Sequence, residues 1–193
     1  MAMAPAYPIT LEVDPAAPQS RLTVFFRLLM VIPQAIVLAF VGIAAYIVTV
    51  IAWFAILITG SYPEGMLRFA SGALRWGVRV EGYAYLLTGS YPPFSLEAIS
   101  DYPIRPGVEG QSANRNRLTA FFRIIMVIPH AIIVQVLGYA VAVVVFISWV
   151  AALFTGSVPE GLHNFIAGYI RWYARYIGYA MLLCDEYPPF SLS

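Results

Sequence analysis

The residues with the clearest potential for chemistry in this sequence are two pairs of arginines. Arg75 and Arg79 stand four positions apart, and so do Arg171 and Arg175, which puts each pair on one face of a helix. A guanidinium group binds a phosphate or a carboxylate through two parallel hydrogen bonds. We therefore interpret these side chains as candidate sites for lipid phosphate or for an acidic group on a partner. Snorkelling toward lipid head groups is the alternative.

Two further arginines, Arg27 and Arg123, close short basic segments that begin at Arg21 and Arg117. Phenylalanine and leucine accompany the arginines there, which is typical of a short helix at a membrane surface. The residues just before these basic segments, Ser20 and Asn116, are of the types that cap helix N-termini. We expect Arg27 and Arg123 to face phosphate groups, as further candidate lipid- or partner-binding residues.

The sequence offers little for catalysis. Its histidines are His130 and His163, its cysteine is Cys184, and no group of ligands recurs at a metal-binding spacing. We therefore predict that the chain is not an enzyme and holds neither a metal nor a cofactor. His130 is expected to be a structural residue that faces the membrane surface. The formal net charge of +1 argues against nucleic acid as a partner.

The elements that must position these residues occur twice in the sequence. The run Arg-Leu-Thr-x-Phe-Phe-Arg begins at Arg21 and again at Arg117, and the run Tyr-Pro-Pro-Phe-Ser-Leu begins at Tyr91 and again at Tyr187. The offset is 96 positions in both cases, and roughly half of the aligned residues are identical. Both copies of a tandem duplication share one fold. The chain divides into a leader (1–20), repeat 1 (21–96), a linker (97–116) and repeat 2 (117–193).

Each repeat contains a long run without any charge, Gln34–Thr59 in the first copy and His130–Thr155 in the second. Each run exceeds the roughly 20 residues that a helix needs to cross a bilayer. The composition agrees, because 61% of the residues are hydrophobic and 11% are charged, against about 25% charged in soluble domains. These runs, with the basic segments before them, predict helices over about 21–59 and 117–155.

A second helix is predicted to follow in each copy, over about 63–88 and 159–184. It carries the arginine pair on a narrow polar stripe, the pattern of an amphipathic helix. The sequence Ser-x-Pro-Glu before each helix matches a capping box. We accordingly predict helix capping by Ser61, Glu64, Ser157 and Glu160. The leader contains one strand-like stretch, Thr10–Val13, which the second copy replaces with Arg105-Pro106-Gly107.

Whether these amphipathic return helices cross the membrane is left open by the sequence. An arginine at the bilayer centre costs on the order of 2.5–3.5 kcal/mol, which favours a helix in the interface. Placing both basic segments on the cytoplasmic side instead requires an even number of crossings per copy, which favours a hairpin. A third variant lets the apolar run itself dip in and out near Gly42 and Gly138. The hairpin gives four membrane helices with both termini cytoplasmic, and it is the arrangement we expect.

The two basic segments, the turn Thr-Gly-x-x-Pro-Glu-Gly, the Arg-Trp helix and the Tyr-Pro-Pro-Phe exit together resemble the bacterial membrane-protein family called domain of unknown function 4389. The resemblance covers almost the whole chain, twice. It implies a helical membrane protein with duplicated domains, and it carries over no catalytic residues.

The expected fold is thus an all-α membrane protein, a tandem repeat with a long transmembrane helix and an arginine-bearing return helix in each copy. We expect a multi-pass protein of the bacterial cytoplasmic membrane, in contact with lipids and with other membrane subunits or itself. The leading function hypothesis is a non-enzymatic accessory or scaffold subunit of a membrane complex. The alternatives, in order, are an anionic-lipid-binding or membrane-shaping protein and a small oligomeric transporter or channel.

Overall fold

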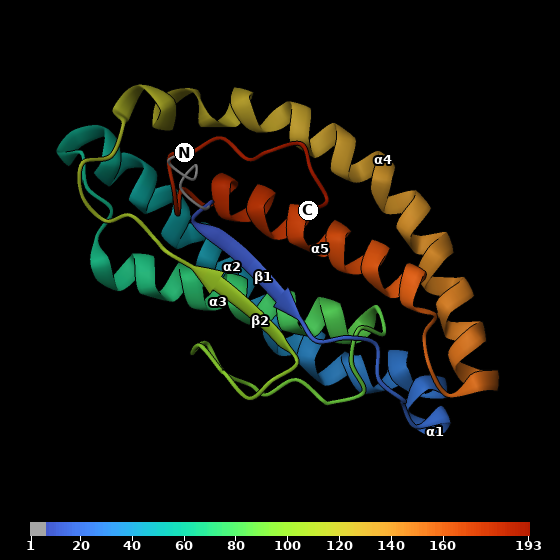
Figure 1. Ribbon diagram of the computed structural model, residues 1–193. Helices are drawn as coiled ribbons and strands as arrows, with labels where there is room; N and C mark the ends of the chain where they lie inside the picture. The colour runs from blue at the N-terminus through green and yellow to red at the C-terminus, as the bar shows by residue number, and fades with distance from the viewer. Residues whose placement is uncertain (1–6) are drawn as a thin grey trace.

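The two long apolar runs form the two longest helices of the computed structural model, which describes residues 7–193 (Figure 1). Helix α2 spans Arg27–Thr59 and helix α4 spans Arg117–Thr155. In the first copy the basic segment forms a separate short helix, α1 (Arg21–Phe25), whereas in the second it is continuous with α4. Both long helices end at a glycine in the left-handed conformation, Gly60 and Gly156, the usual way to stop a helix.

The return helices are α3 (Glu64–Ala84) and α5 (Glu160–Ala180). The predicted capping boxes are not formed, because Pro63 and Pro159 occupy the N-cap positions and neither helix has a side-chain cap. Ser61 and Ser157 therefore lie outside the helices. The first helical residues are Glu64 and Glu160, and a negative charge at this end interacts favourably with the helix dipole. The other predicted caps differ: the Asn116 side chain accepts hydrogen bonds from Leu118 and Thr119, whereas Ser20 makes no side-chain cap bond.

Both return helices end earlier than the predicted residues 88 and 184. Leu86 and Leu182 have φ angles of 66° and 61°, the left-handed conformation that breaks a helix. The amides that follow close each helix: Leu87 N–H donates to the Gly82 carbonyl at 2.9 Å, and Leu183 N–H donates to the Gly178 carbonyl at 3.0 Å. The helices therefore end before the proline-rich segments 91–97 and 187–193, which we call the exit segments.

The fold is mostly helical but not all-α, which corrects the expected fold class. Strands β1 (Ile9–Val13) and β2 (Ile104–Val108) form a two-stranded antiparallel sheet. The predicted strand in the leader is thus present, and the segment that replaces it in the second copy is also a strand. Leu11 pairs with Pro106 at the centre of the register. Pro106 can occupy a strand here because each strand of a two-stranded sheet has a free edge.

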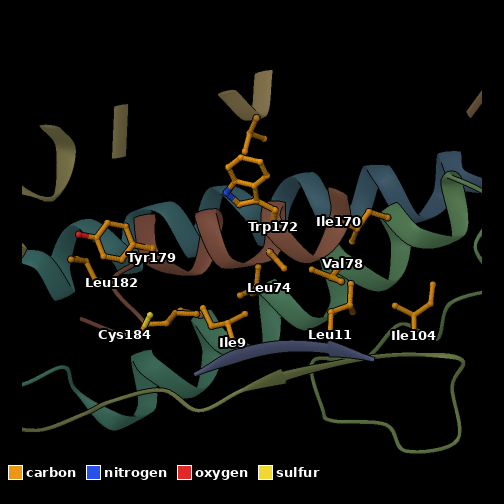
Figure 2. Packing of buried hydrophobic residues seen from close by; sticks show 14 of the residues in the cluster. Ile9, Leu11, Leu74, Val78, Ile104, Ile170, Trp172, Tyr179, Leu182 and Cys184 are labelled. Atoms are coloured by element: carbon orange, nitrogen blue, oxygen red, sulfur yellow. The ribbon is translucent and has the colours of Figure 1, made fainter. Parts of the chain in front are cut away.

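The strands are exchanged between the two copies. β1 precedes repeat 1 but packs on α5 of repeat 2, and β2 precedes repeat 2 but packs on α3 of repeat 1. Figure 2 shows the resulting core, in which Ile9 and Leu11 point from the sheet toward side chains of α3 and α5. The equivalent contacts Ile104 with Gly82 and Ile9 with Gly178 relate the two copies by an approximate two-fold axis.

The elements form three layers. The sheet contacts α3 and α5 but neither α2 nor α4, so α3 and α5 form the middle layer. Helices α2 and α4 cover the other side and run in opposite directions (Figure 1). The end of α2 meets the start of α4, where the Trp53 indole N–H donates to the Ala120 carbonyl at 2.9 Å. The end of α4 meets α1, where Trp149 donates to the Val24 carbonyl at 3.0 Å.

Candidate functional site

The arginines that close the two basic segments are buried inside the protein. Arg27 is 1% exposed and Arg123 is 2% exposed. Each guanidinium group stacks over a tyrosine ring, with a distance from Cζ to the ring centroid of 4.0 Å for Arg27 over Tyr83 and 3.7 Å for Arg123 over Tyr179. A cation over an aromatic face is attracted by the ring quadrupole. These arginines therefore join the start of each long helix to the end of its return helix.

An ion-pair network that the sequence reasoning missed completes the second of these sites. The Asp185 carboxylate accepts hydrogen bonds from Arg115 at 2.8 Å and from Arg123 at 3.0 Å. The Arg115 side chain has no exposed surface, and it also donates to the Leu182 carbonyl at 2.6 Å. The first copy has Gln19 and Gly89 at the equivalent positions. Because the pairing depends on residues about 70 positions apart, no local sequence pattern could have predicted it.

The arginine pairs of the return helices bind backbone carbonyls of the same chain. Arg79 donates to the carbonyls of Glu97, at 2.9 Å, and Ser95, and Arg175 donates to the Ser193 carbonyl at 2.7 Å. Arg75 and Arg171 reach the sheet, donating to the carbonyls of Val108 and Leu11 at 3.2 Å and 3.3 Å. Arg171 also donates to the Leu192 carbonyl at 2.9 Å. Through these hydrogen bonds the two arginine pairs hold the exit segments and the strands against α3 and α5.

The six predicted binding arginines therefore turn inward, to partners within the chain. Arg27 and Arg123 do not present a basic face to phosphate, which differs from the sequence expectation for the basic segments. The physical reason is that proline-rich exits and sheet carbonyls need hydrogen-bond donors, and guanidinium groups supply several each. Arg21, Arg68 and Arg117 are the arginines that remain exposed.

The polar residue near the start of each long helix is also used internally. The Gln34 side-chain oxygen accepts a hydrogen bond from the Trp76 indole at 2.9 Å, and His130 Nδ1 accepts one from Trp172 at 3.1 Å. The His130 ring is fully buried and stacks on Phe190, with a centroid distance of 4.1 Å. His130 is therefore a core residue, which corrects the prediction that it faces the membrane surface.

The most extensive surface feature is an apolar face on α2 and α4. Each helix contacts the rest of the protein through a narrow seam, at Ala45, Ala52 and Ile56 in α2 and at Val141 and Ala152 in α4. Large apolar side chains cover the remaining circumference and are exposed. They include Leu28, Phe40, Ile43, Phe54 and Ile58 on α2, and Ile124, Ile132, Val143, Phe146 and Phe154 on α4.

Both helices are long and apolar enough to cross a membrane, and they are the two candidate spans of the described chain. Exposed apolar area of this extent marks a surface that meets lipid or another protein. Helices α3 and α5 do not qualify as spans by the same measure. The expected four membrane helices thus reduce to two candidates.

The charged surface lies on the opposite side of the middle layer. Arg105 of β2 forms ion pairs with Glu12 of β1, at 3.3 Å, and with Asp14 just after β1, at 2.8 Å, and the Glu12 side chain is 75% exposed. The strands run along the return helices: β1 lies against α5 between Gly178 and Arg171, and β2 lies against α3 between Gly82 and Arg75. The molecule is therefore two-sided, with the apolar faces of α2 and α4 on one side and a charged sheet on the other.

Residues 7–193 contain no group of three or more His, Cys, Asp and Glu side chains that could hold a metal ion. Cys184 is buried, and the Tyr7 hydroxyl lies 3.3 Å from its Sγ. The side chains considered above are instead paired with one another or with backbone carbonyls. The described chain thus presents two surfaces of different character, the apolar face of α2 and α4 and the charged sheet.

A comparison with known families agrees with the resemblance seen in the sequence. The family model described as domain of unknown function (DUF4389) matches residues 21–95 and again residues 117–191. The chain belongs to the DUF4389 family. Both DUF4389 matches begin at the basic segment and end in the exit segment, so β1 and β2 lie outside them. No curated protein and no solved structure matches the chain.

Proposed function

We propose that this DUF4389 protein is a non-enzymatic membrane protein that lies in one leaflet, with α2 and α4 along the bilayer and the sheet in water. In this position it serves as an accessory or scaffold subunit that offers its apolar helices to lipid and to other membrane helices. The observation that carries the proposal is the placement of the exposed apolar face opposite the charged sheet.

The location of the sheet argues against an upright arrangement. If α2 and α4 stood along the membrane normal, the sheet would lie near the bilayer centre, because it packs where α3 and α5 meet, with Gly178 of α5 against both Ile9 of β1 and Leu74 of α3. Its free edges and the exposed Glu12 carboxylate would then meet hydrocarbon. Open sheet edges do not occur in contact with lipid, because each unsatisfied backbone group there costs several kcal/mol. The in-plane arrangement leaves these groups in water.

The lengths and directions of the long helices support the same arrangement. At about 1.5 Å per residue, α2 is about 50 Å long and α4 is longer, against a hydrocarbon thickness of about 30 Å. The two basic segments lie at opposite ends of the molecule, so upright helices would put them on opposite sides of the membrane. The hairpin hypothesis requires both on the cytoplasmic side. An in-plane protein keeps the two segments on one side of the membrane, and a cytoplasmic location of that side remains a prediction.

Cysteine labelling tests the orientation. Ser61 and Asn114 lie at one end of the helical layers and Ser90 and Ser157 at the other, as the hydrogen bonds from Arg115 N–H to the Gly60 carbonyl and from Gln19 N–H to the Gly156 carbonyl indicate. Single cysteines at these four positions, in a Cys184→Ala background, should all react with an impermeant reagent from the same side of sealed vesicles. Opposite sidedness of the two ends would reject the in-plane proposal and favour spanning helices.

The accessory role predicts partners. Purification of the full-length protein from its native membrane in a mild detergent should recover other membrane proteins, and replacing Phe40 and Phe146 with glutamine should release them. These two side chains are 71% and 62% exposed, so the fold should survive their replacement. Recovery of a lone monomer from both the unmodified and the substituted protein would count against a scaffold.

A second function, membrane shaping, is favoured by the one-sided apolar face. A body inserted in one leaflet expands that leaflet and so favours curvature. Addition of the protein to liposomes should then produce smaller or tubular vesicles as the protein-to-lipid ratio rises. Because the candidate arginines bind within the chain, this effect should depend little on anionic lipid. Unchanged vesicle shape at all ratios would remove this function and leave the scaffold role.

A further inference from the structure

The two copies differ in side-chain size where α2 and α4 meet the middle layer. The first copy has Ala73, Gly77, Val80 and Glu81 on α3. The second copy has Tyr169, Tyr173, Tyr176 and Ile177 at the equivalent positions of α5. Three large aromatic side chains thus replace small ones, and one carboxylate has no counterpart. The approximate two-fold symmetry of the fold is broken at this place by side chains alone.

The substitution opens a groove in the first copy. A cavity of about 550 Å³ lies between α2, α3 and the end of α5, and its lining is mostly apolar. This volume falls within the usual range for small-molecule sites. The corresponding space in the second copy holds about 230 Å³. The residues that matter for the groove are Gly42, Ala45, Ala73, Gly77, Glu81 and Tyr173.

The surroundings of two equivalent glycines, Gly42 and Gly138, show the difference in free space between the two copies. A Cβ atom placed on Gly42 of α2 would have no neighbour within 4 Å, apart from its own helix backbone. A Cβ atom on the equivalent Gly138 of α4 would lie 3.1 Å from the Tyr169 hydroxyl. In the second copy the tyrosine therefore fills the space beneath the long helix. In the first copy Ala73 leaves it open.

Glu81 lies in the wall of the groove without a partner. Its side chain forms no hydrogen bond and no ion pair with any residue from 7 to 193. The titratable groups that interact with it electrostatically are phenols: Tyr85, just after α3, and Tyr169 and Tyr173 on α5. Tyr46 of α2 also lines the groove. Burial raises the pKa of the Glu81 carboxyl from 4.5 to about 7. An unpaired carboxyl in an apolar site is a common sign of ligand binding.

We propose that this groove binds the chain of a long-chain amphiphile from the bilayer whose polar group is a hydroxyl or an amine, held by the Glu81 carboxyl. The apolar walls suit a hydrocarbon chain, and the groove borders α2, which exposes its other faces to lipid under the proposed function on which this inference rests. Among the described residues no arginine or histidine lines the groove, so an anionic head group would find no positive charge there. A hydroxyl or an amine can donate a hydrogen bond to a carboxyl oxygen whether the carboxyl is charged or neutral.

The test uses the purified full-length protein in a mild detergent and three diazirine-bearing probes: hexadecylamine, hexadecanol and hexadecanoic acid. The amine and the alcohol should crosslink to the groove residues of α2 and α3 at least about tenfold more than the acid, a difference of about 1.4 kcal/mol. Equal crosslinking by all three probes, or crosslinks spread along the exposed side of α2, would overturn the proposal.

The second copy supplies the matched variants. Glu81→Ile introduces the residue found at position 177, and it should lower labelling by the amine and the alcohol to the level of the acid. Gly77→Tyr introduces the residue found at position 173 and should abolish labelling by all three probes because it fills the cavity. Ile58→Ala, on the exposed side of α2, should leave labelling unchanged. Labelling by the amine that persists in Glu81→Ile would also overturn the proposal.

A conservative variant and the use of detergent separate the possible causes of a negative result. If Gly77→Tyr does not fold, as judged by its circular dichroism, Glu81→Gln still serves, because it keeps the size of the side chain and should remove the preference for the amine over the acid. Binding in detergent does not depend on the orientation of the protein in a bilayer. Failure of the groove and failure of the in-plane arrangement are therefore seen in separate experiments, crosslinking for the first and vesicle labelling for the second.

Discussion

Arg123 and Arg27 occupy equivalent positions, yet their positive charges are balanced in different ways. In the second copy the Asp185 carboxylate lies between Arg123 and Arg115. In the first copy the Arg27 guanidinium is held by neutral groups, donating to the Thr88 carbonyl at 2.9 Å and to the side chain of Gln19. A buried charge without a partner is costly. Two cations thus depend on one carboxylate in the second copy, whereas no carboxylate is required in the first.

At the residue scale we predict that Asp185→Asn destabilises the protein by about 3 kcal/mol, because it leaves Arg115 and Arg123 buried without a counter-charge. Unfolding of the detergent-solubilised protein, followed by circular dichroism, measures the change in free energy. Asp101→Asn is the matched control, since Asp101 is exposed and, within residues 7–193, accepts a side-chain hydrogen bond from Ser100 alone. If the two variants lose a similar amount of unfolding free energy, the buried ion-pair network makes no specific contribution to stability.

At the scale of the elements, the exit segments are held to the return helices by arginines and by glycines. Arg79 and Arg175 bind the exit carbonyls, and the chain lies directly against Gly72 and Gly168. A Cβ atom on Gly72 would lie 2.8 Å from the Leu96 carbonyl oxygen, and one on Gly168 would lie 2.9 Å from the Leu192 oxygen. These glycines are needed for a close backbone approach.

We predict that Gly72→Ala and Gly168→Ala each destabilise the protein by about 1–3 kcal/mol, because backbone atoms of the exit segment must move away from the helix. Gly65→Ala is the control within the same helix as Gly72, since a Cβ atom there would meet no neighbour within 4 Å. Alanine also favours a helix by up to about 1 kcal/mol relative to glycine. Thermal unfolding should therefore distinguish the variants, and equal melting temperatures for Gly72→Ala and Gly65→Ala would contradict the close approach.

At the scale of the whole molecule, the exchange of strands makes each copy depend on the other. The strand that precedes each repeat packs on the return helix of the other copy, because β1 lies on α5 and β2 lies on α3. A sheet of two strands related by a two-fold axis is also a geometry that two identical chains can form. The duplicated protein therefore has the organisation of a fused dimer.

We predict that a chain of residues 1–96 forms a homodimer and does not fold as a monomer, with its strand Ile9–Val13 paired to that of a second copy. The monomer would leave the apolar side chains of Ile9 and Leu11 without the helix that buries them. Native mass spectrometry in a mild detergent measures the oligomeric state, and Leu11→Asp should abolish the dimer. A stable folded monomer of this half would refute the interdependence of the copies.

The sequence by itself determined the duplication, the two long apolar helices, the return helices and the family. Each follows from local periodicity or from the constant offset of 96 positions, which need no knowledge of distant contacts. The cap at Asn116 and the strand in the leader were predictable for the same reason. The second strand was not, because Arg105-Pro106-Gly107 becomes a strand only when β1 provides its partner.

Only the tertiary structure decided how the copies are oriented, where the arginines point and where the groove opens. The antiparallel arrangement of α2 and α4 arises from the pairing of β1 with β2 and from contacts between residues more than 60 positions apart. The arginine stripe fits either a lipid surface or the carbonyls of the exit segments, and sequence spacing is the same in both cases. Long-range packing selects between them, since it brings those carbonyls within hydrogen-bond distance of the guanidinium groups.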